Sequence, residues 1–200
     1  MVSRARRTPV PRFRVYLRTP VRADAPRFLE AVRASRALHR GWVAPPATAH
    51  AFRAYVAHFA QGVHPGSTHA ALLAVRRNDD ALVGVFNFSE IVRGPFQTAY
   101  LGYYGFAPLA RQGYMTEALV LALDRAFGAL GLHRVEANVQ PTNRRSLALV
   151  RRAGFTREGY SRRYVKIAGR WRDHVRFAML AEDWPDARRA LVATMREAAR

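Results

Sequence analysis

The spacing of hydrophobic residues changes several times along the chain, and these changes predict where strands and helices begin and end. Apolar residues alternate with polar ones, or run without interruption, in seven short segments that favour β-strands. These segments are 13–18, 70–75, 82–91, 97–106, 132–139, 155–166 and 171–180. Short turns separate the second, third and fourth segments, so we expect these three strands to form an antiparallel meander.

Apolar residues recur at helical spacing in the intervals between these strands. The clearest helix is predicted for residues 113–130, with Gly131 as its C-cap. The order of strands and helices along the chain predicts a mixed α/β fold. The residues expected to start the other helices are Asp24, Thr48, Thr142 or Asn143, and Pro185.

The length of 200 residues suits one domain with short extensions. Residues 1–12 carry four arginines and no clear hydrophobic period, which predicts a flexible basic arm. Residues 13–184 hold all the predicted strands and form the expected domain. Residues 185–200 are predicted to add an arginine-rich C-terminal helix.

The chain is strongly basic, with 33 Lys and Arg against 14 Asp and Glu and a formal net charge of +19. A field of this sign attracts polyanions such as RNA, phosphates or anionic lipid. All but one of the basic residues are arginine, the exception being Lys166. Arginine suits phosphate recognition, but such a bias also arises from genome base composition, so both interpretations stay open.

The chain contains no cysteine, which excludes disulfides, thiolate catalysis and cysteine-ligated metal sites. No apolar stretch has the length of a membrane span or follows the basic N-terminus as in a signal peptide. We therefore expect a soluble cytoplasmic protein without a membrane partner. Four histidines lie between positions 50 and 69, three of them without a paired carboxylate, so we expect no metal site.

The segment most informative about chemistry is 102–119, where a strand runs through a short turn into the long helix. The N-terminus of a helix presents unpaired N–H groups and the positive end of its dipole. Gly113 at the turn lets an anion approach these groups closely. The segment therefore predicts an anion site, with simple packing as the alternative. The chain lacks both the P-loop and the dinucleotide-binding glycine motifs.

Several short motifs follow the strand–turn–helix segment in a fixed order. They are 132–137 (LHRVEA), 141–146 (PTNRRS), 153–155 (AGF) and 158–160 (EGY). This order resembles that of the GNAT-superfamily acyl-CoA N-acyltransferases. Three further pieces are 93–96 (RGPF), 100–103 (YLGY) and 169–174 (GRWRDH). They are similar to the ribosomal-protein-alanine N-acetyltransferase group, RimJ more than RimL, and the resemblance covers roughly residues 13–184.

This resemblance implies the GNAT fold, a mixed and mostly antiparallel sheet of about seven strands, splayed between the fourth and fifth strands and covered by helices on both faces. It also implies acetyl-CoA as co-substrate, no metal, and the N-terminal amine of a ribosomal protein as acceptor. Backbone amides of the turn would hold the pyrophosphate, although Ala110 and Met115 depart from the family pattern. The implied cofactor-binding residues are Tyr104, Gly105, Phe106, Ala110, Arg111, Gln112, Gly113, Tyr114, Met115, Asn138, Asn143 and Ser146.

Two residues are candidates for catalysis. Ser146 matches the proposed general acid of RimL-like relatives, and its alternative role is that of an ordinary helix-start serine. The resemblance also places an oxyanion-stabilising N–H near Tyr104–Phe106. Glu90 is the best general-base candidate among the few carboxylates. Val165 stands where RimL-like enzymes carry a proposed catalytic glutamate, so that base cannot be carried over. Water can serve instead, because an α-amino group is already partly neutral at cellular pH.

Three functions remain in competition. The first is acetylation of the N-terminal alanine of a ribosomal protein, with contacts to rRNA through the basic ends of the chain. The second is acetylation of a small-molecule amine, which an acceptor groove rich in carboxylates would favour. The third is a basic ribosome-binding or RNA-binding module with minor catalytic activity.

Overall fold

A computed structural model describes residues 13–198. Seven strands form one sheet in the order β1-β2-β3-β4-β5-β7-β6. Neighbouring strands are antiparallel except for β4 and β5, which are parallel. The strands are β1 Val15–Arg18, β2 Ala70–Arg76, β3 Leu82–Val92, β4 Thr98–Gly105, β5 Arg134–Val139, β6 Thr156–Ile167 and β7 Arg170–Leu180.

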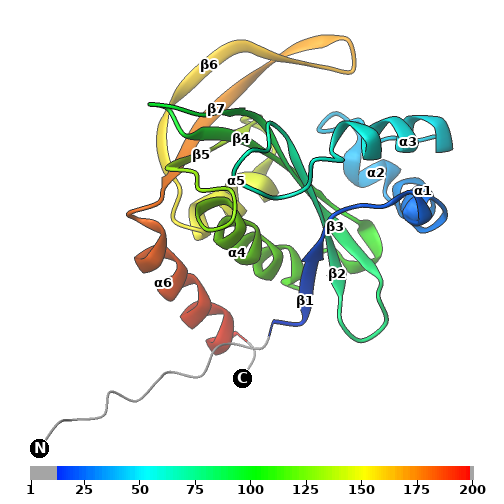
Figure 1. The fold of residues 1–200 in the computed structure, drawn as a ribbon, viewed down its shortest axis with the longest axis horizontal. Coiled ribbons are helices and arrows are strands. Elements are labelled where there is room, and N and C mark those ends of the chain that lie inside the picture. The colour runs from blue at the N-terminus through cyan, green and yellow to red at the C-terminus, as the bar shows by residue number, and fades with distance from the viewer. Residues whose placement is uncertain (1–12, 199–200) are drawn as a thin grey trace, which may run out of the picture.

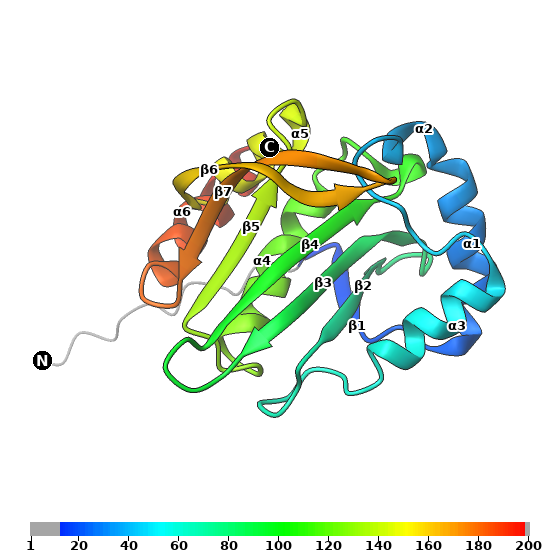
Figure 2. The same ribbon diagram turned by 90° about the horizontal axis from the view of Figure 1, so that it is seen from above.

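Helices cover both faces of this sheet (Figure 1, Figure 2). The short helices α1 to α3 pack on one face, and α4 to α6 pack on the other. The helices are α1 Ala25–Ala34, α2 Arg36–His39, α3 Ala49–His58, α4 Tyr114–Phe127, α5 Arg144–Arg152 and α6 Trp184–Glu197. Two short 3₁₀ turns, Arg22–Asp24 and Ala107–Leu109, precede α1 and follow β4.

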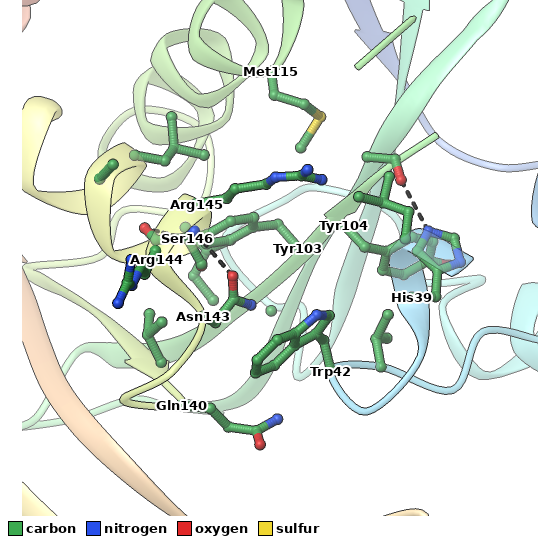
Figure 3. Close-up of a pocket in the computed structure, with 18 of the residues that line it drawn as sticks. His39, Trp42, Tyr103, Tyr104, Met115, Gln140, Asn143, Arg144, Arg145 and Ser146 are labelled. Carbon is green, nitrogen blue, oxygen red and sulfur yellow. Dashed lines mark hydrogen bonds between the residues drawn. The ribbon is translucent and has the colours of Figure 1, made fainter. Parts of the chain in front are cut away.

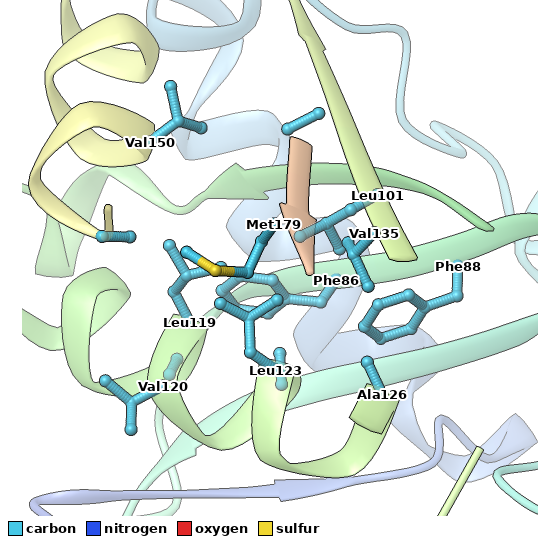
Figure 4. Packing of buried hydrophobic residues seen from close by; sticks show 14 of the residues in the cluster. Phe86, Phe88, Leu101, Leu119, Val120, Leu123, Ala126, Val135, Val150 and Met179 are labelled. Carbon is cyan, nitrogen blue, oxygen red and sulfur yellow. The ribbon is translucent and has the colours of Figure 1, made fainter. Parts of the chain in front are cut away.

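Two hydrophobic clusters fix these layers, because successive side chains of a strand point to opposite faces. In β3, Phe86 packs with Leu119 and Leu123 of α4 in the larger cluster (Figure 4). The neighbouring Val85 packs with Phe28 of α1 in the smaller cluster. The sheet is therefore apolar on both sides, which explains the continuous apolar segments in the sequence.

The sheet is splayed between its fourth and fifth strands, as predicted. β4 and β5 pair only from Thr98–Tyr100 to Arg134–Glu136. Beyond this point β4 continues to Gly105, while β5 keeps pairing with β7 as far as Val139. The two strands thus diverge and leave backbone groups of β4 without a neighbouring strand.

Two predicted helix ends differ in the structure. The long helix stops at Phe127 with Gly128 as its C-cap, and Gly131 lies in the following turn with a φ of 60°. Asp24 precedes α1, but its side chain makes no cap hydrogen bond. Its carboxylate instead pairs with Arg18 and accepts the N–H of Val21, because a cation lies within reach.

The C-terminal helix α6 belongs to the same core as the rest of the domain. Leu191 and Val192 are buried in the larger cluster, and Arg188 forms an ion pair with Asp124 of α4. The basic arm predicted for residues 1–12 lies outside the described residues. Within residues 13–198, no helix combines the length and apolarity that crossing a bilayer requires.

Candidate active site

The splay between β4 and β5 opens into a cleft of about 1120 Å³. One end of the cleft lies against the loop before α4, and the other against α2, the loop after it and the β6–β7 hairpin. Figure 3 shows Tyr103 and Ser146 on one side of it and His39 and Trp42 on the other. The cleft therefore joins segments that lie more than a hundred residues apart in the sequence.

The loop before α4 presents a row of backbone donors. The N–H groups of residues 111–115 have no acceptor among the described residues, whereas those of Thr116 and Glu117 bond to the carbonyl of Gly113. Gly113 adopts the left-handed region with a φ of 82° and offers no side-chain cap to the helix. These free donors at the positive end of a 14-residue helix form a site for an anion.

Arg14 and Glu117 hold this loop in place. Glu117 is buried, and its carboxylate accepts the backbone N–H of Arg14 at 2.6 Å and the side-chain Nε at 2.5 Å. The same Arg14 side chain donates to the carbonyl of Gln112 at 2.9 Å and covers the ring of Tyr114 at 4.4 Å. The carbonyl side of the loop is thus satisfied by protein groups, which leaves its N–H side for a ligand.

The end of β4 supplies one more donor at the fork. Phe106 donates its N–H to Val83 of β3 at 2.8 Å. Because N–H groups alternate in direction along a strand, those of Tyr103 and Gly105 point away from β3, toward the splay. His39 Nε2 donates to the Gly105 carbonyl at 2.9 Å, which fixes this peptide. Of the predicted segment Tyr104–Phe106, Gly105 is therefore the residue whose N–H faces the cleft.

Two hydroxyl groups meet across the fork. The Oγ of Ser146 lies 2.5 Å from the hydroxyl of Tyr103, and burial raises the pKa of Tyr103 to about 12. Asn143 caps α5 by accepting the N–H of Ser146 at 3.2 Å, which explains why the serine occupies this place. The pair stays neutral and hydrogen-bonded at physiological pH, so either hydroxyl can pass on a proton.

The cleft lining is basic. No Asp or Glu lines it among the described residues, whereas Arg111, Arg144, Arg145 and Arg152 do. The predicted base Glu90 is exposed and lies outside the lining. Ser89 lines the cleft, whereas Phe86 and Phe88 face α4, so the alternation of β3 places Glu90 on the face away from the cleft. A bulge between Ser89 and Val92, with a φ of 48° at Glu90, then leaves this side chain in solvent.

Two buried histidines line the cleft instead, and the sequence analysis found neither. Burial lowers the pKa of both His39 and His174. His174 Nδ1 donates to the carbonyl of Arg172 at 3.0 Å, which leaves Nε2 as a neutral acceptor. His174 ends the GRWRDH piece of the family resemblance, which gave it no role, and no motif marks His39. The fold alone brings α2 and β7 to the cleft.

The structure gathers nine of the predicted site residues around the cleft. Phe106 is fully buried in the smaller cluster, and Tyr114 is buried beneath Arg14, so neither side chain reaches it. Gln112 points outward and donates to the carbonyl of Pro108, so it contributes backbone only. Those that line the cleft are Tyr104, Gly105, Ala110, Arg111, Gly113, Met115, Asn138, Asn143 and Ser146.

Three buried polar atoms of cleft-lining residues also lack partners. They are Oδ1 of Asn138, the hydroxyl of Tyr104 and Nδ1 of His39, and no described residue hydrogen-bonds to them. A ligand that fills the cleft can supply the missing partners. Within residues 13–198, no three His, Cys, Asp or Glu side chains are grouped so that they could hold a metal ion.

Comparison with known proteins places this geometry in a family. Residues 14–156 match the acetyltransferase (GNAT) domain. The [ribosomal protein uS5]-alanine N-acetyltransferase of Escherichia coli is 41% identical over 111 residues, which cover 56% of this chain and 57% of that protein. The chain thus matches less than two thirds of this relative's length.

Solved structures show the same architecture. Mycobacterium smegmatis RimJ in complex with CoA-disulfide has a TM-score of 0.82 and 27% identity, covering 91% of this chain and 90% of that one. The ribosomal-protein-S5-alanine acetyltransferase from Vibrio fischeri has a TM-score of 0.76 and 23% identity, covering 88% and 97%. The predicted fold and family are confirmed, and the chain belongs to the GNAT acetyltransferase family.

Proposed function

We propose that this protein transfers the acetyl group of acetyl-CoA to the N-terminal α-amino group of a ribosomal protein, with alanine as the preferred first residue. Family membership supports the donor, and the relatives that act on ribosomal protein alanine support the acceptor. This function takes place where ribosomes are, in the cytoplasm.

The basic lining of the cleft is the observation that carries the choice of acceptor. A polyamine enters as a multiply charged cation and needs carboxylates, but four arginines and no carboxylate line the cleft among the described residues. An α-amino group has an ordinary pKa of about 7.7–8.0, so a useful fraction is already neutral. The cleft therefore favours a single weakly basic amine over a polycation.

The residues of the cleft fit acetyl-CoA, which supplies an activated thioester when bound. The free amides of residues 111–115 would hold the diphosphate at the start of α4. Asn138 and Asn143 would contact the part of the ligand that lies between β5 and α5. The Gly105 N–H would face the acetyl oxygen, and Ser146, backed by Tyr103, would return a proton to the sulfur.

His174 is the proposed acceptor of the proton that the amine releases. It lines the cleft, and its hydrogen bond to Arg172 leaves Nε2 unprotonated. The ring of Tyr164 lies beside it, and the neighbouring Asp173 is occupied by Tyr160 and by the N–H of Arg163. Glu90 does not line the cleft, so it does not accept this proton directly. His174, or a water molecule that His174 orients, takes the role of proton acceptor.

Incubation of the enzyme with acetyl-CoA and short peptides tests the proposal. Peptides that begin with Ala, Ser or Met, each with an internal lysine, are compared by mass spectrometry with the same peptides blocked at the N-terminus. We expect acetylation of the free α-amino group, fastest for alanine, and none of the blocked peptides. Acetylation of spermidine but of no peptide would instead establish a small-molecule acetyltransferase, and acetylation of neither would reject the enzymatic proposal.

A further inference from the structure

The β6–β7 hairpin extends beyond the rest of the sheet. β7 pairs with β5 only from Leu180 back to Val175, so residues 170–174 have no neighbour on that side. Figures 1 and 2 show this end of the hairpin curling away from the sheet and passing over the ends of β4 and β5. One of its faces borders the cleft through Val165 and Ile167, which leaves the other face toward solvent.

An unusual set of side chains lies on and around this outer face. Trp171 is 60% exposed although tryptophan is normally largely buried. It lies directly opposite Lys166 in the register, so both side chains leave the same face. Tyr160 lies on this face as well, 47% exposed, with its hydroxyl bonded to Asp173 at 2.6 Å.

The charges of this end of the hairpin are almost all positive. Arg162, Arg163, Lys166 and Arg170 are exposed, and none forms an ion pair among the described residues. The nearest carboxylate, that of Asp173, already accepts the Tyr160 hydroxyl and the Arg163 N–H. Arg170 lies opposite Ile167, so its side chain leaves the face that borders the cleft. We call Tyr160, Arg162, Arg163, Lys166 and Trp171 the hairpin surface.

We propose that the hairpin surface binds single-stranded RNA. An exposed indole offers a plane on which an unpaired base can stack, and the flanking cations suit the phosphates on either side of that base. An exposed tryptophan alone would suit many partners, but three cations without ion pairs on the same hairpin surface favour a polyanion. The choice of RNA over DNA rests on the proposed function, because the proposed acceptor belongs to the ribosome. The stacking and charge arguments for a single-stranded nucleic acid are independent of that function.

This surface and the cleft can act together. The outer face of the hairpin is free while its inner face borders the cleft, so a bound RNA strand leaves the cleft open. Binding to RNA near the acceptor would raise the local concentration of the N-terminus without any new contact to it. The basic ends of the chain, from which rRNA contact was first expected, are not needed for this.

Fluorescence anisotropy with labelled oligouridylate, measured without acetyl-CoA, tests the proposal apart from catalysis. Trp171→Ala removes the stacking plane, so we expect about tenfold weaker binding with an unchanged dependence on salt. The double variant Arg162→Ala/Lys166→Ala should lower the slope of log affinity against log salt by about 1.4, since each phosphate contact on a single strand contributes about 0.7.

A matched control separates the hairpin from the overall charge of the protein. Arg33 and Arg53 are exposed on α1 and α3 and form no ion pair among the described residues, so Arg33→Ala/Arg53→Ala removes the same charge elsewhere. This variant should keep the wild-type salt slope. Equal effects of both double variants, or unchanged affinity in Trp171→Ala, would overturn the proposal.

Two further measurements complete the test. The first measures binding of wild type and Trp171→Ala to phosphatidylserine vesicles. If Trp171→Ala no longer binds the vesicles but binds RNA as well as the wild type does, the surface binds a membrane and the proposal is overturned. Acetylation of the alanine peptide should be the same in Trp171→Ala and wild type, because Trp171 does not line the cleft. If the peptide assay fails, the RNA-binding result can therefore still be interpreted. If RNA binding fails, the peptide assay can still be interpreted.

Discussion

The two ends of the cleft are built in different ways. The loop end consists of five consecutive residues, 111–115, whose free backbone N–H groups form the candidate anion site. The other end consists of side chains from distant segments, such as His39 on α2 and His174 on β7. A site made of backbone tolerates changes of side chain, whereas a site made of side chains depends on each of them. The loop end should therefore suit coenzyme A, which is the same in every reaction, and the side-chain end should determine which acceptor is bound.

The largest expected effect lies where the two ends meet, at Ser146. Ser146→Ala removes the proposed proton donor, so we expect kcat to fall by about 100-fold or more while the affinity for coenzyme A stays unchanged. Steady-state kinetics and calorimetry measure the two quantities. Tyr103→Phe should lower kcat by a smaller factor. The activation free energy lost in the double variant should be smaller than the sum of the two single losses, because the two hydroxyls act as one unit. An unchanged kcat in Ser146→Ala would assign the serine to the helix start alone.

The next effect concerns the backbone end. Gly113→Ala places a Cβ 3.2 Å from Nη2 of Arg14 in a left-handed conformation, next to the free amides. We expect about tenfold weaker binding of coenzyme A and a loss of about 1–2 kcal/mol in the free energy of unfolding. Gly131→Ala is the control, because Gly131 has a similar backbone conformation with no neighbour within 4 Å of the added Cβ. It should lose stability without losing affinity, and equal affinities in the two variants would remove the loop from the binding site.

A smaller effect is expected at the side-chain end. His174→Gln removes the proposed proton acceptor, but part of the amine is already neutral, so kcat/KM should fall by about threefold to tenfold. The loss should shrink as the pH rises toward the pKa of the amine, since less deprotonation is then needed. A pH profile of kcat/KM measures this, and coenzyme A affinity should not change. A loss that is the same at every pH would show that His174 only packs.

The smallest effect is one of stability. Burial lowers the pKa of His39 and His174 in the folded state, so the unfolded chain binds more protons below its histidine pKa of about 6.5. The free energy of unfolding should be constant above this pH and fall as the pH decreases through it. Urea denaturation between about pH 7.5 and about pH 5.5 measures the change.

The matched variants for this test are chosen by burial. His39→Gln with His174→Gln should flatten the dependence on pH, while substitution of the exposed His50 should leave it as in the wild type. The same slope in all variants would mean that other groups are responsible.

The same contrast explains what could be predicted from the sequence. The strands, the long helix and the turn at Gly113 follow from local patterns, because hydrophobic period and glycine placement act over a few residues. The fork between β4 and β5 came from the family resemblance. Its geometry depends on where β5 leaves β4 after Glu136 and stays with β7, which no local pattern encodes.

The residues that sequence reasoning missed or misplaced depend on contacts over long separations. His39 lies 66 residues from the carbonyl it holds at Gly105. Glu90 was expected in the groove because it is one of few carboxylates and lies late in a central strand, but it is Ser89, on the opposite face, that lines the cleft. Side-chain sites of this kind become visible only when the topology is known.

The most direct test of the account is calorimetric titration of the protein with coenzyme A, because every proposed step at the fork requires the loop end to bind it. The account predicts saturable binding to one site, a rise in Tm on addition of the ligand, and a clear weakening in Gly113→Ala but not in Gly131→Ala. Absence of heat and of thermal stabilisation at millimolar coenzyme A would contradict it.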